Sequence, residues 1–167
     1  MAGCDDAAME MVMREVAKKH IKFSEDYREQ LYLDQLKYPT FGWGHCFDAS
    51  ESYSDIKDYA NKLFEKDFSR AYADYLKIIY TFNLQNLSCP RRMVILDMCY
   101  NMNYNKVAKF VNSLRMLREE RWVDAVTNLQ QSLWFKQVGN RAKRLVKVII
   151  DNEYPIIPNR TASGVLI

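Results

Sequence analysis

Few residues in this sequence interrupt regular structure, and no segment of it is uniformly apolar. The chain of 167 residues contains only 5 glycines and 4 prolines, and helix-forming residue types dominate the rest, so we expect a mostly helical protein. No stretch approaches the roughly 20 apolar residues of a membrane-spanning helix, which argues against stable membrane insertion. The start of the chain lacks the basic segment and apolar run of a secretory signal, so we expect synthesis in a cytoplasm.

Histidine and cysteine are too few and too scattered to predict a metal centre. Four cysteines occur without a C-x-x-C spacing: Cys4, Cys46, Cys89 and Cys99. His20 and His45 are the only histidines, so no metal site is expected. We interpret the cysteines as free thiols, which suits a reducing cytoplasm.

The net charge of +3 conceals a basic C-terminal half. Residues 1–80 carry 11 Lys and Arg against 15 Asp and Glu, a net charge of −4, whereas residues 81–167 carry 13 against 6, a net charge of +7. A basic surface attracts polyanionic partners through long-range electrostatics. Nucleic acid, an anionic membrane surface and the bacterial cell wall all fit this charge, which by itself does not choose among them.

The pattern of apolar residues predicts two helices separated by a small β region. Apolar side chains in residues 8–25 recur at helical intervals. Glycines and Pro39 punctuate residues 27–53 in a way that is typical of short strands and turns. A helical rhythm then continues over residues 54–80 for about seven turns, which predicts one long helix.

Several short amphipathic helices are predicted in the rest of the chain, before a tail that contains proline, serine and glycine. We therefore divide the chain into an N-terminal helix with a small β lobe (1–53), a connecting helix (54–80), a helical lobe (81–154) and a tail (155–167). The predicted fold class is α+β and mostly helical, with a β-hairpin or three-stranded sheet in the small lobe and a larger all-helical C-terminal lobe.

Three polar residues of the predicted small lobe, Glu25, Asp34 and Thr40, form a candidate catalytic group. Glycoside hydrolysis needs one protonated carboxyl, which gives its proton to the leaving oxygen, and one ionised carboxylate, which stabilises the transition state or activates water. Glu25, at the end of a helix, is the better candidate for the proton donor, and Asp34, near a turn, for the ionised group. Most carboxyl pairs in a chain with 21 acidic residues are solvated surface groups, so this spacing alone does not identify a site.

The residues that follow make the pattern more specific. Glu25, Asp34 and Thr40 precede a G-x-G-H motif at residues 42–45, and the whole arrangement resembles the phage-type lysozymes, glycoside hydrolase family 24. A second block over residues 110–144 resembles the large lobe of the same family. Together with part of the connecting helix, the resemblance extends over roughly residues 21–150 and implies a lysozyme-like fold.

The resemblance implies a catalytic role for each matching residue. Glu25 would be the general acid, Asp34 the carboxylate on the far face of the sugar, and Thr40 the residue that positions the attacking water. The family is thought to invert the anomeric centre, which requires carboxyl groups about 6.5–9.5 Å apart. The implied reaction is hydrolysis of the β-1,4 bond between N-acetylmuramic acid and N-acetylglucosamine in bacterial peptidoglycan, without metal or other cofactor.

Further matches imply supporting and substrate-binding residues. Arg141 matches an arginine that pairs with the catalytic glutamate, which creates a tension because a cation favours the ionised form of a group that must be protonated. His45 and Asp67 match an ion pair between the small lobe and the connecting helix, and we prefer a structural role for His45. Five residues align with the saccharide cleft: Cys46, Tyr100, Asn101, Ser113 and Asn128. Of these, Tyr100 fits a sugar-stacking side chain and a core tyrosine equally well.

These implications predict a monomeric endolysin. It would be made in the host bacterial cytoplasm without a signal peptide and would act on the cell wall after release, with no nucleic-acid partner. One alternative keeps the fold without strong catalysis, as a lysozyme-like peptidoglycan-binding or phage structural module. A small basic nucleic-acid binder is a third alternative, but it leaves the catalytic group and the G-x-G-H motif without a purpose. The residues before the matched region could form a longer first helix, a docking segment or an unremarkable extension.

Overall fold

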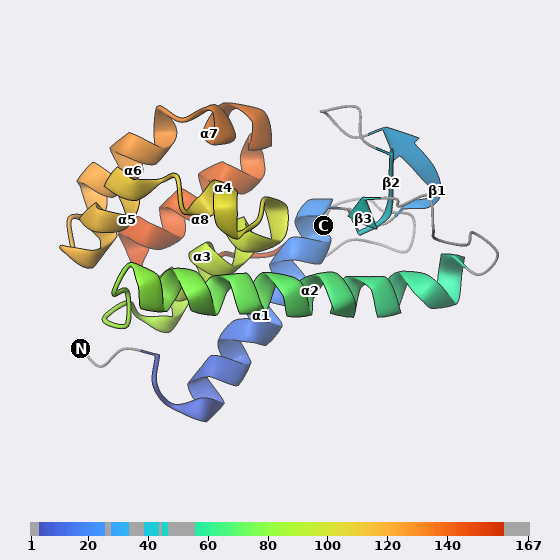
Figure 1. Ribbon diagram of the computed structural model, residues 1–167, viewed down its shortest axis with the longest axis horizontal. Coiled ribbons are helices and arrows are strands. Elements are labelled where there is room, and N and C mark those ends of the chain that lie inside the picture. The colour runs from blue at the N-terminus through green and yellow to red at the C-terminus, as the bar shows by residue number, and fades with distance from the viewer. Residues whose placement is uncertain (1–3, 26–27, 34–38, 44, 47–55, 159–167) are drawn as a thin grey trace.

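A long helix extends along the molecule, with a small sheet near one end and a helical lobe near the other (Figure 1). The computed structural model describes residues 4–25, 28–33, 39–43, 45–46 and 56–158, and it describes side chains at 4–25, 43 and 60–158. The long helix is α2 (Ile56–Thr81), close to the bounds expected from the sequence. Its apolar face packs against the helical lobe through Phe64, Phe68 and Tyr75, each at most 2% exposed.

Helix α1 (Ala7–Glu25) leads from the helical lobe to the sheet. Asp6 caps its N-terminus, because the Oδ1 atom accepts the backbone N–H groups of Ala8 and Met9 at 2.8 and 3.1 Å, and a carboxylate also suits the positive end of the helix dipole. The buried residues of α1 recur at three- and four-residue intervals: Met13, Ala17, His20 and Ile21. They face α3. Since α1 ends at Glu25, this packing fixes where Glu25 lies relative to the helical lobe.

The sheet consists of β1 (Arg28–Leu33), β2 (Pro39–Gly42) and β3 (His45–Cys46), paired antiparallel in that order. The predicted α+β class was wrong, because it treats this sheet as a major part of the fold. The strands are only 6, 4 and 2 residues long, and helices with their connecting loops supply the described core. Strands this short cannot bury a core of their own, so the molecule is a helical fold that carries a small sheet.

The helical lobe is built around α3. Its helices are α3 (Cys89–Asn101), α4 (Tyr104–Val107), α5 (Val111–Arg118), α6 (Trp122–Gln130), α7 (Leu133–Val138) and α8 (Asn140–Asp151). Residues 92–100 of α3 are all buried, as expected of a helix surrounded by α1, α2 and α8. Among the described helices, none is both long and apolar enough to cross a membrane.

The chain turns between α7 and α8 at Gly139. Its backbone has φ 66° and ψ −125°, a region that residues with a Cβ atom avoid. This conformation lets α8 begin directly after α7 in a new direction. Arg141, two residues later, is thereby placed on the face of α8 that meets α1.

A disulfide between Cys4 and Cys89 joins the segment before α1 to the start of α3, with a Cα–Cα distance of 4.8 Å. The prediction that all four cysteines are free thiols was therefore wrong. The two cysteines are 85 residues apart in sequence, and only the packing of α1 on α3 brings them together, so spacing could not reveal the pair. Cys99 is a free, buried thiol, and the side chain of Cys46 lies outside the described part of the chain.

The disulfide should contribute strongly to stability. Closing an 85-residue loop restricts the unfolded chain, and the chain-entropy model gives roughly 4.5 kcal/mol for a loop of this size. We expect the double variant C4S/C89S to unfold at a clearly lower urea concentration than the wild type. Dithiothreitol should lower the wild-type midpoint to that of the variant and leave the variant unchanged. Equal midpoints for both proteins without reductant would contradict the bond.

The substitution Gly139→Ala should destabilise the protein by about 1–3 kcal/mol, the usual cost of a strained backbone conformation. No atom lies within 4 Å of a Cβ built at this position, so the loss would come from the backbone angles and not from a clash. Urea unfolding followed by circular dichroism measures it. A wild-type midpoint would show that residue 139 tolerates a side chain.

Candidate active site

Glu25 lies at the C-terminal end of α1, where its carboxylate forms an ion pair with Nη1 of Arg141 on α8. The side chain of Glu25 is 20% exposed and that of Arg141 only 7%. Glu25 is thus open to solvent on one side and held from the protein interior on the other. This arrangement suits a carboxyl group that must exchange a proton with a bound molecule.

Arg141 bridges two carboxylates. Besides contacting Glu25, its Nε donates a hydrogen bond of 2.7 Å to Oδ1 of Asp97 on α3. Asp97 is completely buried. The third nitrogen of the guanidinium, Nη2, is also buried and has no hydrogen-bond partner among the described residues.

A buried histidine completes the network behind Arg141. Nδ1 of His20 lies 2.6 Å from Oδ2 of Asp97, and Nε of Arg144 donates to Nε2 of His20 at 3.0 Å. Arg144 also donates to the hydroxyl of Ser24 at 2.9 Å, and that hydroxyl donates to the carbonyl of His20 at 2.7 Å. The network therefore ties α1, α3 and α8 together directly behind Glu25.

The two central charges of this network stabilise each other. Burial by itself raises the pKa of Asp97, but the Arg141 guanidinium and the His20 hydrogen bond outweigh burial and hold this pKa below its ordinary value. Burial disfavours the charge of Arg141 too, yet Asp97 and Glu25 together raise the pKa of Arg141 above its ordinary value. Asp97 and Arg141 are consequently a fully ionised buried pair.

The other predicted catalytic residues are described less completely. Asp34 lies outside the described residues. Thr40 is in β2, where the strand register places its backbone opposite Cys46 of β3, and the side chains of both lie outside the described part. The structure thus shows Arg141 paired with Glu25, as the resemblance implied, and the roles of Asp34 and Thr40 stay predictions.

The predicted ion pair of His45 and Asp67 is described on one side only. His45 is in β3, and its side chain lies outside the described part. Asp67 is half-buried on α2, and its charge contributes to raising the pKa of Tyr100. The pairing itself stays a prediction.

Tyr100 has an anchoring position at the end of α3. It is 7% exposed, its hydroxyl donates to the carbonyl of Trp43 at 2.8 Å, and its ring lies 5.6 Å from that of Phe64. Burial, opposed only in part by nearby arginines, raises its pKa well above the ordinary value. The placement favours the core alternative over sugar stacking, because both ends of the side chain contact protein.

Trp43 connects the sheet to the helices. Its ring meets that of Phe64 edge-on at 5.8 Å, and the ammonium group of Lys22 lies 4.3 Å from the ring centre, within the range of a cation–π contact. With the hydrogen bond from Tyr100, the turn between β2 and β3 contacts α1, α2 and α3. The sheet is therefore fixed close to the end of α1 that carries Glu25.

The remaining predicted cleft residues lie in the helical lobe. Ser113 of α5 is buried and its hydroxyl donates to the side-chain oxygen of Asn128 on α6 at 2.6 Å. Asn101, at the exposed end of α3, accepts a hydrogen bond of 3.3 Å from the indole nitrogen of Trp134. The structure thus joins Ser113 to Asn128, and it places Asn101 on a different helix.

His20, Asp97 and Arg144 were missed as site residues from the sequence. Asp97 carried a usable signal, since it is a charged residue inside a segment of α3 that is otherwise apolar, VILDMCY. His20 also carried one, because it shares the helical spacing of the buried residues of α1. Neither signal shows the partner, which comes from a distant part of the chain.

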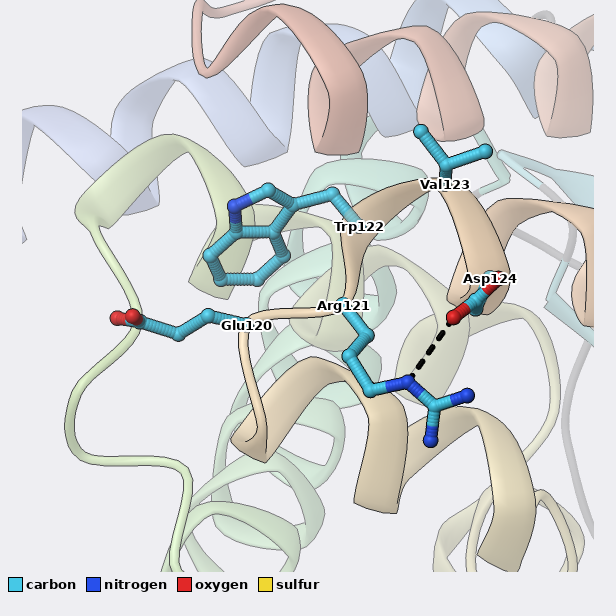
Figure 2. Close-up of a pocket in the computed structure, with 5 residues that line it drawn as sticks. All are labelled: Glu120, Arg121, Trp122, Val123 and Asp124. Carbon is cyan, nitrogen blue, oxygen red and sulfur yellow. Dashed lines mark hydrogen bonds and ion pairs between the residues drawn. The ribbon is translucent and has the colours of Figure 1, made fainter.

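A second surface feature lies at the start of α6, away from this network. Figure 2 shows a shallow depression lined by Glu120, Arg121, Trp122, Val123 and Asp124. Its main polar contact is an ion pair of 2.9 Å between Nε of Arg121 and Asp124. Because the feature is open and lies on the side of the helical lobe far from the sheet (Figure 1), we do not assign it to the candidate site.

The chain is similar in sequence to several known proteins, but these similarities do not assign it to a family. No protein-family model matches the chain. It is similar to the probable T4-type lysozymes 1 and 2 of Dictyostelium discoideum, with 28% identity over 160 residues (79% of this chain and 92% of that protein) and 26% over 159 residues (78% and 91%). It is also similar to the pre-baseplate central spike protein Gp5 of Enterobacteria phage T4, with 26% identity over 157 residues that cover 78% of this chain and 27% of Gp5. The two lysozymes confirm the predicted resemblance to the phage-type lysozymes.

The buried ion pair of Asp97 and Arg141 should make the free energy of unfolding fall at acid pH. The pKa of Asp97 is lower in the folded protein than its unfolded value of about 3.9, so its stabilisation is complete above that value and is lost as the pH falls toward the folded pKa. We expect the free energy of unfolding, measured in urea between about pH 6 and pH 2, to fall less steeply for Asp97→Asn than for the wild type. Asp124→Asn, at an exposed aspartate, should keep the wild-type slope.

Proposed function

We propose that this protein is a muramidase that hydrolyses the β-1,4 bond between N-acetylmuramic acid and N-acetylglucosamine in bacterial peptidoglycan. The observation that carries the proposal is Glu25, which is partly exposed at the end of α1 and paired with the buried Arg141. It occupies the position of the catalytic glutamate in the motif shared with the phage-type lysozymes. The relatives named as lysozymes support the same activity.

In the proposed reaction, Glu25 gives its proton to the glycosidic oxygen as the bond to the leaving sugar breaks. Asp34, as the ionised carboxylate, takes a proton from the attacking water on the opposite face of the sugar. Thr40 orients that water. This sequence inverts the anomeric centre and needs a gap of about 6.5–9.5 Å between the two carboxyl groups, which leaves room for the water.

Substrate contacts are proposed from the same resemblance. The amide groups of Asn101 and Asn128 are suited to hydrogen bonds with the hydroxyl and acetamido groups of the glycan. Ser113 is buried and would orient Asn128 through the hydrogen bond from its hydroxyl. Cys46 would border the same cleft, and the buried Tyr100 would support it from the core. The net charge of +7 over residues 81–167 would attract the anionic wall, an effect that added salt should weaken.

The place of action follows from the substrate. We propose that the protein acts on the cell wall as a monomeric endolysin after release from the cytoplasm of a host bacterium. The disulfide between Cys4 and Cys89 fits work outside the cytoplasm, because such bonds persist in oxidising compartments.

A second candidate function is a lysozyme-like structural module that binds peptidoglycan with little catalysis. The similarity to Gp5, a central spike protein of which the matched part is only 27%, favours this alternative. A module of that kind has no chemical need for a glutamate, an aspartate and a threonine in the catalytic spacing.

Replacement of the proposed acid tests the function. We expect Glu25→Gln to lower the release of muropeptides from purified sacculi by at least about 10²–10⁴-fold, the usual contribution of a general acid. Mass analysis of the fragments identifies the bond that is cut. Glu15→Gln, at an exposed glutamate of the same helix, should release fragments at the wild-type rate. If the wild type releases no fragments although it binds sacculi, the structural module is the better description.

A further inference from the structure

Hydrogen bonding fixes the protonation state of His20. Its Nε2 atom lies 3.0 Å from Nε of Arg144, which can only donate, so Nε2 must carry a lone pair. The proton of the ring is then on Nδ1, which faces Oδ2 of Asp97 at 2.6 Å. His20 is consequently a neutral donor to Asp97, and a second proton on the ring would break its contact with Arg144.

The contact of Arg141 with two carboxylates matters for the charge balance of the site. A general acid must carry its proton when the substrate binds, and a protonated Glu25 no longer neutralises Arg141. Arg141 is 7% exposed, and a buried guanidinium without a counter-ion is strongly unfavourable. Asp97 is completely buried and bonded to the same guanidinium at 2.7 Å, so it supplies a negative charge that does not depend on the state of Glu25.

We propose that Asp97 and His20 are a positioning pair, in which Asp97 is the permanent counter-ion of Arg141 and His20 holds Asp97 in place, so that Glu25 can gain and lose its catalytic proton without displacing Arg141. The proposal rests on the general-acid role of Glu25 in the proposed function. A cation beside Glu25 favours its ionised form, although a general acid must be protonated. The negative charge of Asp97 offsets much of the effect of Arg141 on Glu25 and so reduces this conflict.

Few other charged groups face Glu25 from the described helices. Helix α8 contributes Arg141 and Arg144, and α3 contributes Asp97 and Tyr100, whose pKa both Glu25 and Asp67 of α2 help to raise. From α1 itself come His20 and the hydroxyl of Ser24. Asp97 bonds Nε of Arg141 and Glu25 bonds Nη1 of the same guanidinium, so a change at residue 97 should act on Glu25 through Arg141.

The substitution Asp97→Asn tests the proposal through the pH profile of kcat/KM on soluble peptidoglycan fragments. The alkaline limb of the profile reports the loss of the proton from the general acid. Without the charge of Asp97, the full field of Arg141 acts on Glu25, so this limb should move to lower pH by about one unit or more. Asp124→Asn, at an exposed aspartate, should leave the limb where the wild type has it.

Variants of His20 test the second half of the pair. His20→Leu removes the donor to Asp97 and should move the alkaline limb in the same direction by a smaller amount. His20→Asn places an amide N–H near the position of Nδ1 and should restore the limb toward the wild type. If Asp97→Asn does not fold, as judged by circular dichroism, this pair of variants still decides, because identical limbs in His20→Leu, His20→Asn and the wild type would overturn the proposal.

A readout that needs no activity separates this proposal from the proposed function. NMR titration of ¹³C-labelled glutamate carboxyls, with Glu25 assigned by Glu25→Gln, follows the proton on Glu25 directly. A titration shifted to lower pH in folded Asp97→Asn supports the coupling even if the protein cleaves no glycan. An unchanged titration in folded Asp97→Asn overturns the positioning pair, whatever the activity of the wild type.

Discussion

The ionic contact of Arg141 with Asp97 and Glu25 is the constraint on which the rest of the candidate site depends. A guanidinium this deeply buried is stable only between carboxylates, so α3 and α8 must meet where Asp97 and Arg141 face each other. Helix α1 joins them through His20 and ends at Glu25. The position of the candidate acid is thus set by the helices α1, α3 and α8 and not by the small sheet that follows α1.

The sheet is attached to this frame by aromatic contacts. Trp43 brings its ring against Phe64 of α2 and its carbonyl against the hydroxyl of Tyr100. Arg70 of α2 donates to the carbonyls of Cys99 and Tyr100 at 3.0 and 3.1 Å, which satisfies the last turn of α3 and holds Tyr100 toward the sheet. Two kinds of contact therefore converge on the site, a charged one from the helical lobe and an aromatic one from the long helix.

The sequence predicted those features that depend on local pattern or on a shared motif. The periodicity of apolar residues predicted α1 and α2 nearly to their observed ends, and the motif led to Glu25 and its partner Arg141. It did not predict the contacts between distant segments: His20 with Asp97, 77 residues apart, or Cys4 with Cys89. Such pairs depend on how helices pack, which no spacing along the chain encodes. The α+β class was wrong for a related reason, since glycine and proline predict turns but say little about how much core the strands between them bury.

The disulfide also affects the outcome of proteolytic cleavage of the backbone. It joins residues 4 and 89, so α1, the sheet and α2 all belong to one covalent ring. A single cut of the backbone within that ring opens it but releases no fragment. Glu25 would therefore stay attached to α3, and through it to the partners of its carboxylate, even in a nicked molecule. This linkage therefore makes a single backbone cut within the ring less damaging to the candidate site than a cut after residue 89.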